Sequence, residues 1–77
     1  MSKEETIELA KEHLNIAKDF CDSGNFWRAD TELVLASYYL KEMPVEKVRN
    51  LILEIKELKL RIKNGTNVFN NQSGVTL

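Results

Sequence analysis

The sequence predicts an all-α protein, a three-helix bundle followed by a polar C-terminal tail. Apolar residues recur at spacings of three and four in three segments of the 77-residue chain. Turn-forming residues divide these segments, Asp22-Ser23-Gly24-Asn25 after the first and Met43-Pro44 after the second. Hydrophobic residues make up 43% and charged residues 30% of the chain, a balance typical of folded domains. We therefore expect one helical domain over residues 1–64 and a flexible or partner-docked tail over residues 65–77.

The first helix is predicted over residues 3–21. Ser2 and Glu5 have the spacing of a capping box, in which a hydroxyl and a carboxylate each accept a free amide proton at the helix start. The apolar stripe contains Ile7, Ala10, Leu14, Ala17 and Cys21. Charged residues fill the opposite face, so this helix is amphipathic and packs on one side. The four-residue connection that follows makes the second helix its antiparallel neighbour.

The second helix, predicted from residue 26 to about residue 42, is apolar on nearly every side. One stripe contains Ala29, Leu33, Ala36 and Leu40, a second contains Trp27, Val34 and Tyr38, and a third contains Leu35 and Tyr39. A helix that is apolar all round needs neighbours on all sides, and this chain has only two other helices to offer. We therefore expect at least one of Trp27, Tyr38 and Tyr39 to remain partly exposed.

The third helix is predicted to begin at Met43-Pro44, since proline is tolerated in the first turn of a helix. Its apolar residues repeat every seven positions and form a narrow seam of Val45, Val48, Leu51, Ile52, Ile55, Leu58 and Ile62. Asn64-Gly65 predicts the end of this helix, because both residues tolerate left-handed backbone angles. The asparagine-rich residues beyond it show no period, which is typical of a mobile tail or of a peptide that docks on a partner.

No catalytic or metal-binding motif is visible. His13 and Cys21 are the only histidine and the only cysteine, whereas a zinc site needs three or four ligands. We expect His13 to be satisfied by solvent or a nearby carboxylate, and Cys21 to act as a small buried hydrophobic residue. The three glycines are too dispersed to form a phosphate-binding loop. The sequence thus predicts a protein that is not an enzyme and has no cofactor or metal.

Charge and length narrow the choice of partner and compartment. A formal net charge of -1 argues against a general nucleic-acid binder. No segment has the roughly 20 apolar residues that span a bilayer, and the N-terminus lacks the features of a secretory signal. With one cysteine and no signal, a cytoplasmic protein is the expectation. A domain of this size gains only about 3–5 kcal/mol from its core, which favours self-association.

The candidate binding residues lie on the second helix. Tryptophan, tyrosine and arginine are the residue types enriched in the hot spots of protein–protein interfaces. Since the neighbouring helices cannot cover every apolar side of this helix, its uncovered part is the expected interface. The candidate protein-binding residues are Trp27, Arg28, Leu35, Tyr38 and Tyr39.

A small anionic ligand is the alternative occupant of the site. Lys56, Lys59, Arg61 and Lys63 make the end of the third helix basic, which also complements the helix dipole. An anion or nucleotide site would form there if Arg28 and the tyrosines converged on that end. A base would stack on Trp27 or Tyr38 while a guanidinium bound phosphate.

Residues 10–43 resemble a single, degenerate tetratricopeptide-type helical hairpin. The residues that carry the resemblance are Ala17 and Phe20, Gly24-Asn25-Phe26 at the turn, and Ala29 and Ala36. The chain departs from that pattern at His13, where a tryptophan is usual, and has its closing proline late, at Pro44. No second repeat follows, although such arrays stack several units. The resemblance implies a helical protein-binding scaffold and no inherited binding residues.

These features predict a small regulator, adaptor or inhibitor that binds another protein and self-associates. Inhibitory mini-proteins of phages and mobile elements have this size and this lack of chemistry. The alternative is a helical oligomer that binds a small ligand or nucleotide between subunits. A DNA-binding helix-turn-helix would bind duplexes in a salt-sensitive way, but the near-neutral charge and the aliphatic third helix argue against it.

Overall fold

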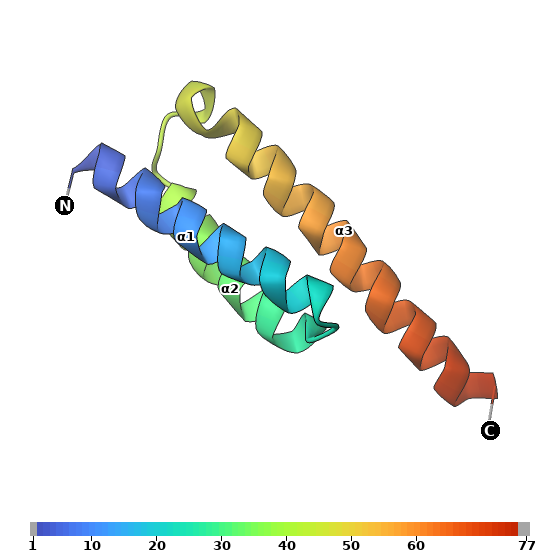
Figure 1. Ribbon diagram of the computed structural model, residues 1–77. Helices are drawn as coiled ribbons and strands as arrows, with labels where there is room; N and C mark the ends of the chain where they lie inside the picture. Colours follow the sequence, from blue (N-terminus) through green and yellow to red (C-terminus); the bar gives the residue numbers. More distant parts are fainter. Residues whose placement is uncertain (1, 76–77) are drawn as a thin grey trace.

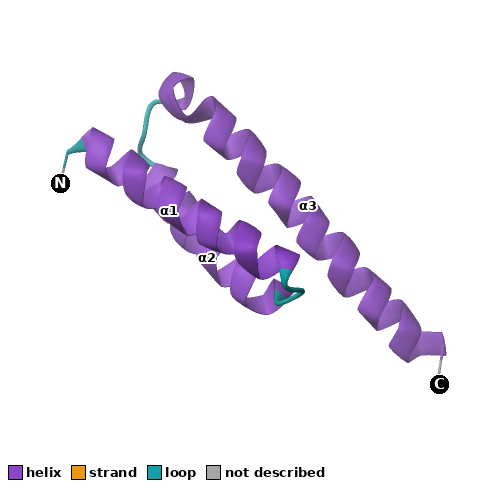
Figure 2. Ribbon diagram, viewed as in Figure 1, coloured by secondary structure: helices purple, strands orange, loops and turns teal. Residues whose placement is uncertain are grey.

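The computed structural model describes the backbone of residues 2–75 and the side chains as far as residue 66. It contains three helices, α1 (Lys3–Asp22), α2 (Phe26–Leu40) and α3 (Val45–Val75), and no strand within residues 2–75. Helices α1 and α2 form an antiparallel hairpin, and α3 runs back along it and projects beyond its turn (Figures 1 and 2). The predicted all-α three-helix bundle is confirmed.

The two ends of the hairpin have the local structure that the sequence predicts. The Ser2 hydroxyl accepts a hydrogen bond from the Glu5 amide at 3.1 Å, and the Glu5 carboxylate accepts one from the Ser2 amide at 3.3 Å. At the turn, Gly24 has a φ of 81°, a conformation that favours glycine. The Asn25 side chain then caps α2 by accepting a hydrogen bond from the Arg28 amide at 3.3 Å. These contacts fix where α1 begins and where the chain reverses.

The core is formed by one stripe from each helix. Its members are at most 8% exposed: Ala10, Leu14, Ala17 and Cys21 of α1; Ala29, Leu33, Ala36 and Leu40 of α2; and Val48, Ile55, Leu58 and Ile62 of α3. These stripes match the predicted periodicities, except that Leu51 and Ile52 of the predicted third-helix seam are only partly buried and Val45 is exposed. Because two alanines stand in each of the first two stripes, α1 and α2 can approach closely, and they form the tightest pair of the bundle.

Helix α3 does not end at Asn64-Gly65, and that prediction was wrong. The helix continues to Val75, and Gly65 lacks the positive φ of a helix stop. Glycine and asparagine permit a left-handed residue but do not impose one, and no proline follows Pro44 to break the helix. The boundary predicted at residue 64 therefore does not coincide with the helix end. Docking of residues 65–77 on a partner stays a prediction, and the side chains from residue 67 onward lie outside the described part.

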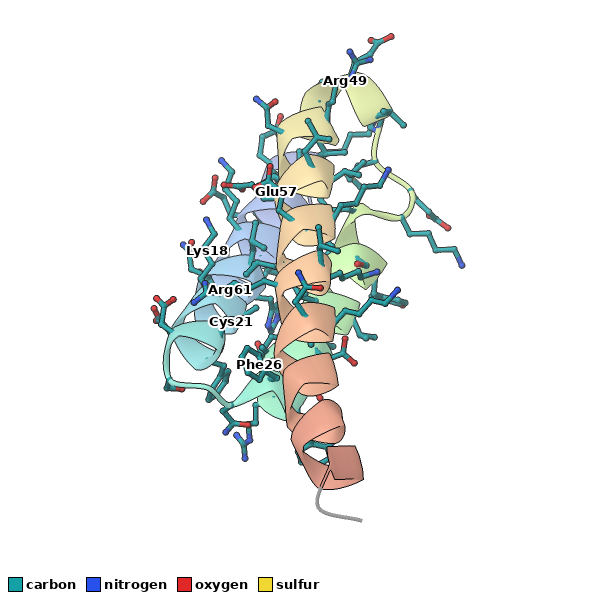
Figure 3. All side chains as sticks on the ribbon, turned by 90° about the vertical axis from the view of Figure 1, so that its right-hand side faces the viewer. Lys18, Cys21, Phe26, Arg49, Glu57 and Arg61 are labelled. Atoms are coloured by element: carbon teal, nitrogen blue, oxygen red, sulfur yellow. The ribbon has the colours of Figure 1, made fainter. Side chains whose placement is uncertain are left out.

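Gly65 has a different role, in packing. A Cβ atom added there would lie 2.6 Å from the Phe26 ring, because that ring rests against the backbone of α3. Figure 3 labels Phe26 near the start of α2, beside α3. The absence of a side chain at residue 65 thus lets the first residue of α2 reach α3, and it closes the bundle next to the hairpin turn.

This close approach gives a double-mutant prediction. In a helix, Gly65→Ala alone would gain about 1 kcal/mol from propensity. Displacement of the Phe26 ring costs about 1–3 kcal/mol, so we expect the single variant to be less stable than the wild type by up to about 2 kcal/mol. In a Phe26→Ala background the same change should be stabilising. Urea denaturation of the four proteins measures this coupling, and equal effects of Gly65→Ala in both backgrounds would refute the contact.

Candidate protein-binding surface

Three large side chains of α2 face solvent together. Trp27, Val34 and Tyr38 are 81%, 58% and 72% exposed. Their spacings of seven and four place them in one stripe. At 100° per residue this stripe lies on the side of α2 opposite the buried alanines and leucines. We call these three residues the outer face of α2. The prediction that at least one of the helix's aromatic residues remains exposed is confirmed.

The outer face is uncovered because α1 and α3 are both engaged on the other side of α2. Single exposed apolar residues are common on folded proteins. A tryptophan, a tyrosine and a valine exposed along one side of the same helix are different, since clustered apolar surface marks interaction sites. The stripe is also rigid, because it stands on a helix whose opposite side is fixed in the core.

The other three predicted site residues lie on the flank of α2 that faces α1. The Tyr39 ring stacks on His13, with centroids 5.6 Å apart, and meets the Tyr38 ring edge-on. The Arg28 guanidinium lies over the Phe20 ring, 5.7 Å from its centroid. Leu35 is 38% exposed. The five residues therefore occupy two adjoining surfaces, and their part in binding stays a prediction.

His13 has the neighbour that the sequence predicts. Its Nδ1 atom lies 2.7 Å from a carboxylate oxygen of Glu32, and both side chains are largely buried between α1 and α2. Together with the stacked Tyr39 ring, this contact holds the histidine as part of the hairpin. Within the described residues, no three histidine, cysteine, aspartate or glutamate side chains come together as metal ligands.

Cys21 is buried at the end of α1 and behaves as a core residue. Burial raises the pKa of its thiol, and the positive charge of Arg61 offsets this only in part. The thiolate is the reactive form of cysteine, so a raised pKa keeps the thiol protonated and unreactive at neutral pH. Cys21 therefore packs in the core as expected.

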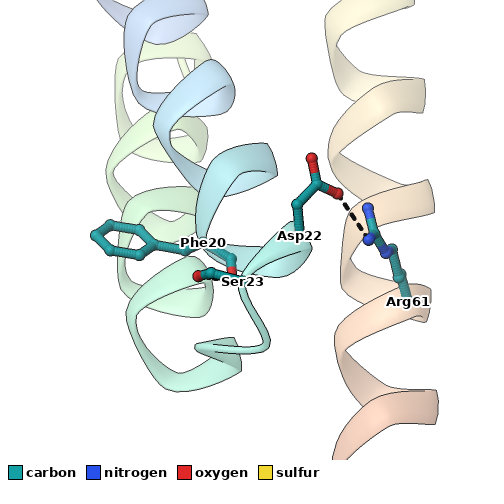
Figure 4. A network of polar contacts seen from close by, with 4 residues as sticks. All are labelled: Phe20, Asp22, Ser23 and Arg61. Carbon is teal, nitrogen blue, oxygen red and sulfur yellow. Dashed lines mark hydrogen bonds and ion pairs between the residues drawn. The ribbon is translucent and has the colours of Figure 1, made fainter.

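The basic end of α3 is divided between two flanks. On the flank facing α1, Arg61 pairs with Asp22 at 2.8 Å (Figure 4). On the same flank, Glu54 pairs with Lys18 at 3.2 Å. Figure 4 shows Phe20, over which Arg28 lies, pointing away from α3. Arg28 and Arg61 therefore do not come together, and the binding of a small anion or nucleotide stays a prediction.

The flank facing α2 carries the remaining lysines of that region. Two open hollows lie along this side between α2 and α3, and Lys59 lines both of them. One hollow, of about 270 Å³, is lined by Ser37, Leu40, Lys41, Met43, Val45, Ile52, Ile55, Lys56 and Lys59. The other, of about 600 Å³, is lined by Phe26, Trp27, Asp30, Lys59, Ile62, Lys63 and Thr66. We call this feature the α2–α3 groove.

The spacing of the lysines, unlike the total charge of the segment, could have predicted the basic side of this groove. Lys56, Lys59 and Lys63 are spaced by three and four, which puts them on one side of a helix, whereas Arg61 falls on another. Treating the four residues as one basic end combined three lysines on the α2 side of α3 with an arginine that forms an ion pair on the α1 side. Trp27 lines the groove as well, so the groove adjoins the outer face of α2.

None of the described helices has the length and apolar character needed to cross a membrane. No protein-family model matches the chain, and comparisons with curated proteins and with solved structures give no match. The tetratricopeptide-like character of residues 10–43 thus stays a prediction, although the antiparallel hairpin that it implies is present.

Proposed function

We propose that this chain is a non-enzymatic regulator, adaptor or inhibitor that binds another protein through the outer face of α2. The exposure of Trp27 and Tyr38 on one helical stripe is the observation that carries the proposal. Both side chains present a large rigid surface with a polar atom at the edge, the combination found in interface hot spots. Arg28 and Leu35 extend this surface toward α1.

The free energy gained by burying two aromatic side chains supports the outer face of α2 as a binding surface. Complete burial of a large apolar side chain contributes about 1.5–3 kcal/mol before association costs. Two such anchors on a preformed helix lose little conformational entropy on binding, because the helix is already ordered by the core. The same surface can bind a second copy of the chain, and self-association is part of the proposal.

Site-specific photocrosslinking tests the proposal and captures the partner in the same step. Benzoylphenylalanine would replace Trp27 or Tyr38, or Glu57 as a control, and the cells would be irradiated. Glu57 is exposed on α3, at a position that lines neither hollow of the groove. We expect positions 27 and 38 to give one discrete adduct, with a partner protein or with a second copy of the chain. Excess protein without benzoylphenylalanine should suppress this adduct. Adducts that form equally from position 57, or none at all, would reject the outer face as the interface.

A further inference from the structure

We propose that the α2–α3 groove docks an acidic amphipathic helix of the partner protein, which lies between α2 and α3 as the fourth helix of a bundle. This inference rests on the proposed function and specifies the chemistry of the partner. It follows from three properties of the groove: the charge of its edges, the apolar character of its floor, and its position beside the outer face of α2.

The charge of the groove is one-sided. Lys41, Lys56, Lys59 and Lys63 line it, and Asp30 is the only acidic residue among the described side chains that line it. None of these four lysines takes part in an ion pair between described side chains, whereas the other flank of α3 is joined to α1 by two ion pairs. The chain as a whole has a net charge of -1, so this positive charge is confined to the groove, and no described ion pair neutralises it. It would attract carboxylates and repel a basic partner.

The floor of the groove is apolar. Leu40, Ile52 and Ile55 line the first hollow, and Phe26 and Ile62 line the second. A free anion or a nucleic-acid backbone would leave this floor in water. An occupant that matches both features has apolar side chains on one side and carboxylates at its edges, which is the pattern of an amphipathic acidic helix.

The shape of the groove suits a helix. It runs between two antiparallel helices, and α2 has 15 residues, which corresponds to about 22 Å or four helical turns. A helix laid there would contact the apolar floor at spacings of three, four and seven residues. Its carboxylates would reach Lys56, Lys59 and Lys63, which follow the α3 edge at the same helical spacing.

Docking in the groove also explains why Trp27 is left uncovered. Trp27 lines the second hollow and belongs to the outer face of α2, so it stands at the edge where the two surfaces meet. A fourth helix would cover its ring while burying the groove floor. One partner helix would thereby cover exposed apolar side chains of α2 and pair its carboxylates with the lysines of α3.

The test is an NMR titration of the full-length ¹⁵N-labelled protein with two synthetic peptides. Both would be helical and about 15 residues long, to match α2, with the same leucine face, and they would carry glutamate or lysine at all other positions. Three proteins would be compared: the wild type, Lys56→Glu with Lys59→Glu, and the control Lys47→Glu with Arg49→Glu. The control makes the same charge change on the same helix at residues that line neither hollow.

We expect the glutamate peptide to shift the amides of Lys41, Ile52 and Lys59, and to bind about tenfold or more tightly than the lysine peptide. The groove variant should reverse that preference, and the control should retain it. No shift at the groove amides, or equal preference in all three proteins, would overturn the inference. So would groove shifts that follow protein concentration without peptide, which would identify a second copy, or shifts produced by a DNA duplex. A partner crosslinked from positions 27 and 38, with no groove response, would leave the proposed function intact.

Discussion

Replacing Leu33 with alanine is expected to unfold a large part of the protein population at room temperature. Leu33 is fully buried and is among the largest side chains that the core encloses completely. Truncation of a buried leucine to alanine typically costs about 2–5 kcal/mol, from lost transfer energy and the cavity left behind. A 77-residue bundle of this kind has only about 3–5 kcal/mol from its core, so the loss approaches the whole stability.

A matched control separates the loss of burial from the loss of leucine itself. Leu60 is 59% exposed on α3, so Leu60→Ala should change the free energy of unfolding by no more than about 0.5 kcal/mol. Circular dichroism during urea denaturation would measure both variants. Similar midpoints for Leu33→Ala and Leu60→Ala would show that the stripe containing Leu33 is not the core.

In contrast to Leu33→Ala, replacing Trp27 and Tyr38 together with alanine is expected to change stability little and to weaken partner binding strongly. Both side chains are mostly exposed, so the free energy of unfolding should change by about 1 kcal/mol or less. Truncation of a hot-spot aromatic residue typically costs about 2 kcal/mol or more of binding energy. Because about 1.4 kcal/mol corresponds to a tenfold change in affinity, the double variant should bind its partner at least about 30-fold more weakly.

Much of the fold could be predicted from the sequence because its rules are local. The capping box of Ser2 and Glu5, the turn at Gly24 and the three buried stripes follow from spacing and residue type alone. The exposure of at least one of Trp27, Tyr38 and Tyr39 was also predictable. The other two helices can cover only part of α2, and the stripe of Ala29, Leu33, Ala36 and Leu40 packs against them best.

The features that were missed depend on contacts between distant parts of the chain. Asn64-Gly65 has the composition of a helix stop, and only the Phe26 ring, 39 positions earlier, shows why a glycine stands in the middle of α3. The groove is a second case. Spacing could place Lys59 and Arg61 on different sides of α3, but only the packing reveals that Arg61 meets Asp22 while Lys59 borders an apolar hollow.

The most direct test of the outer face of α2 as a binding surface is the affinity of the crosslinked partner for the Trp27→Ala, Tyr38→Ala variant. Calorimetric titrations would compare it with the wild type and with Leu60→Ala, after thermal unfolding has shown all three to be folded. We predict an affinity at least about 30-fold weaker for the double variant and unchanged for Leu60→Ala. Equal affinities of the double variant and the wild type would contradict the account.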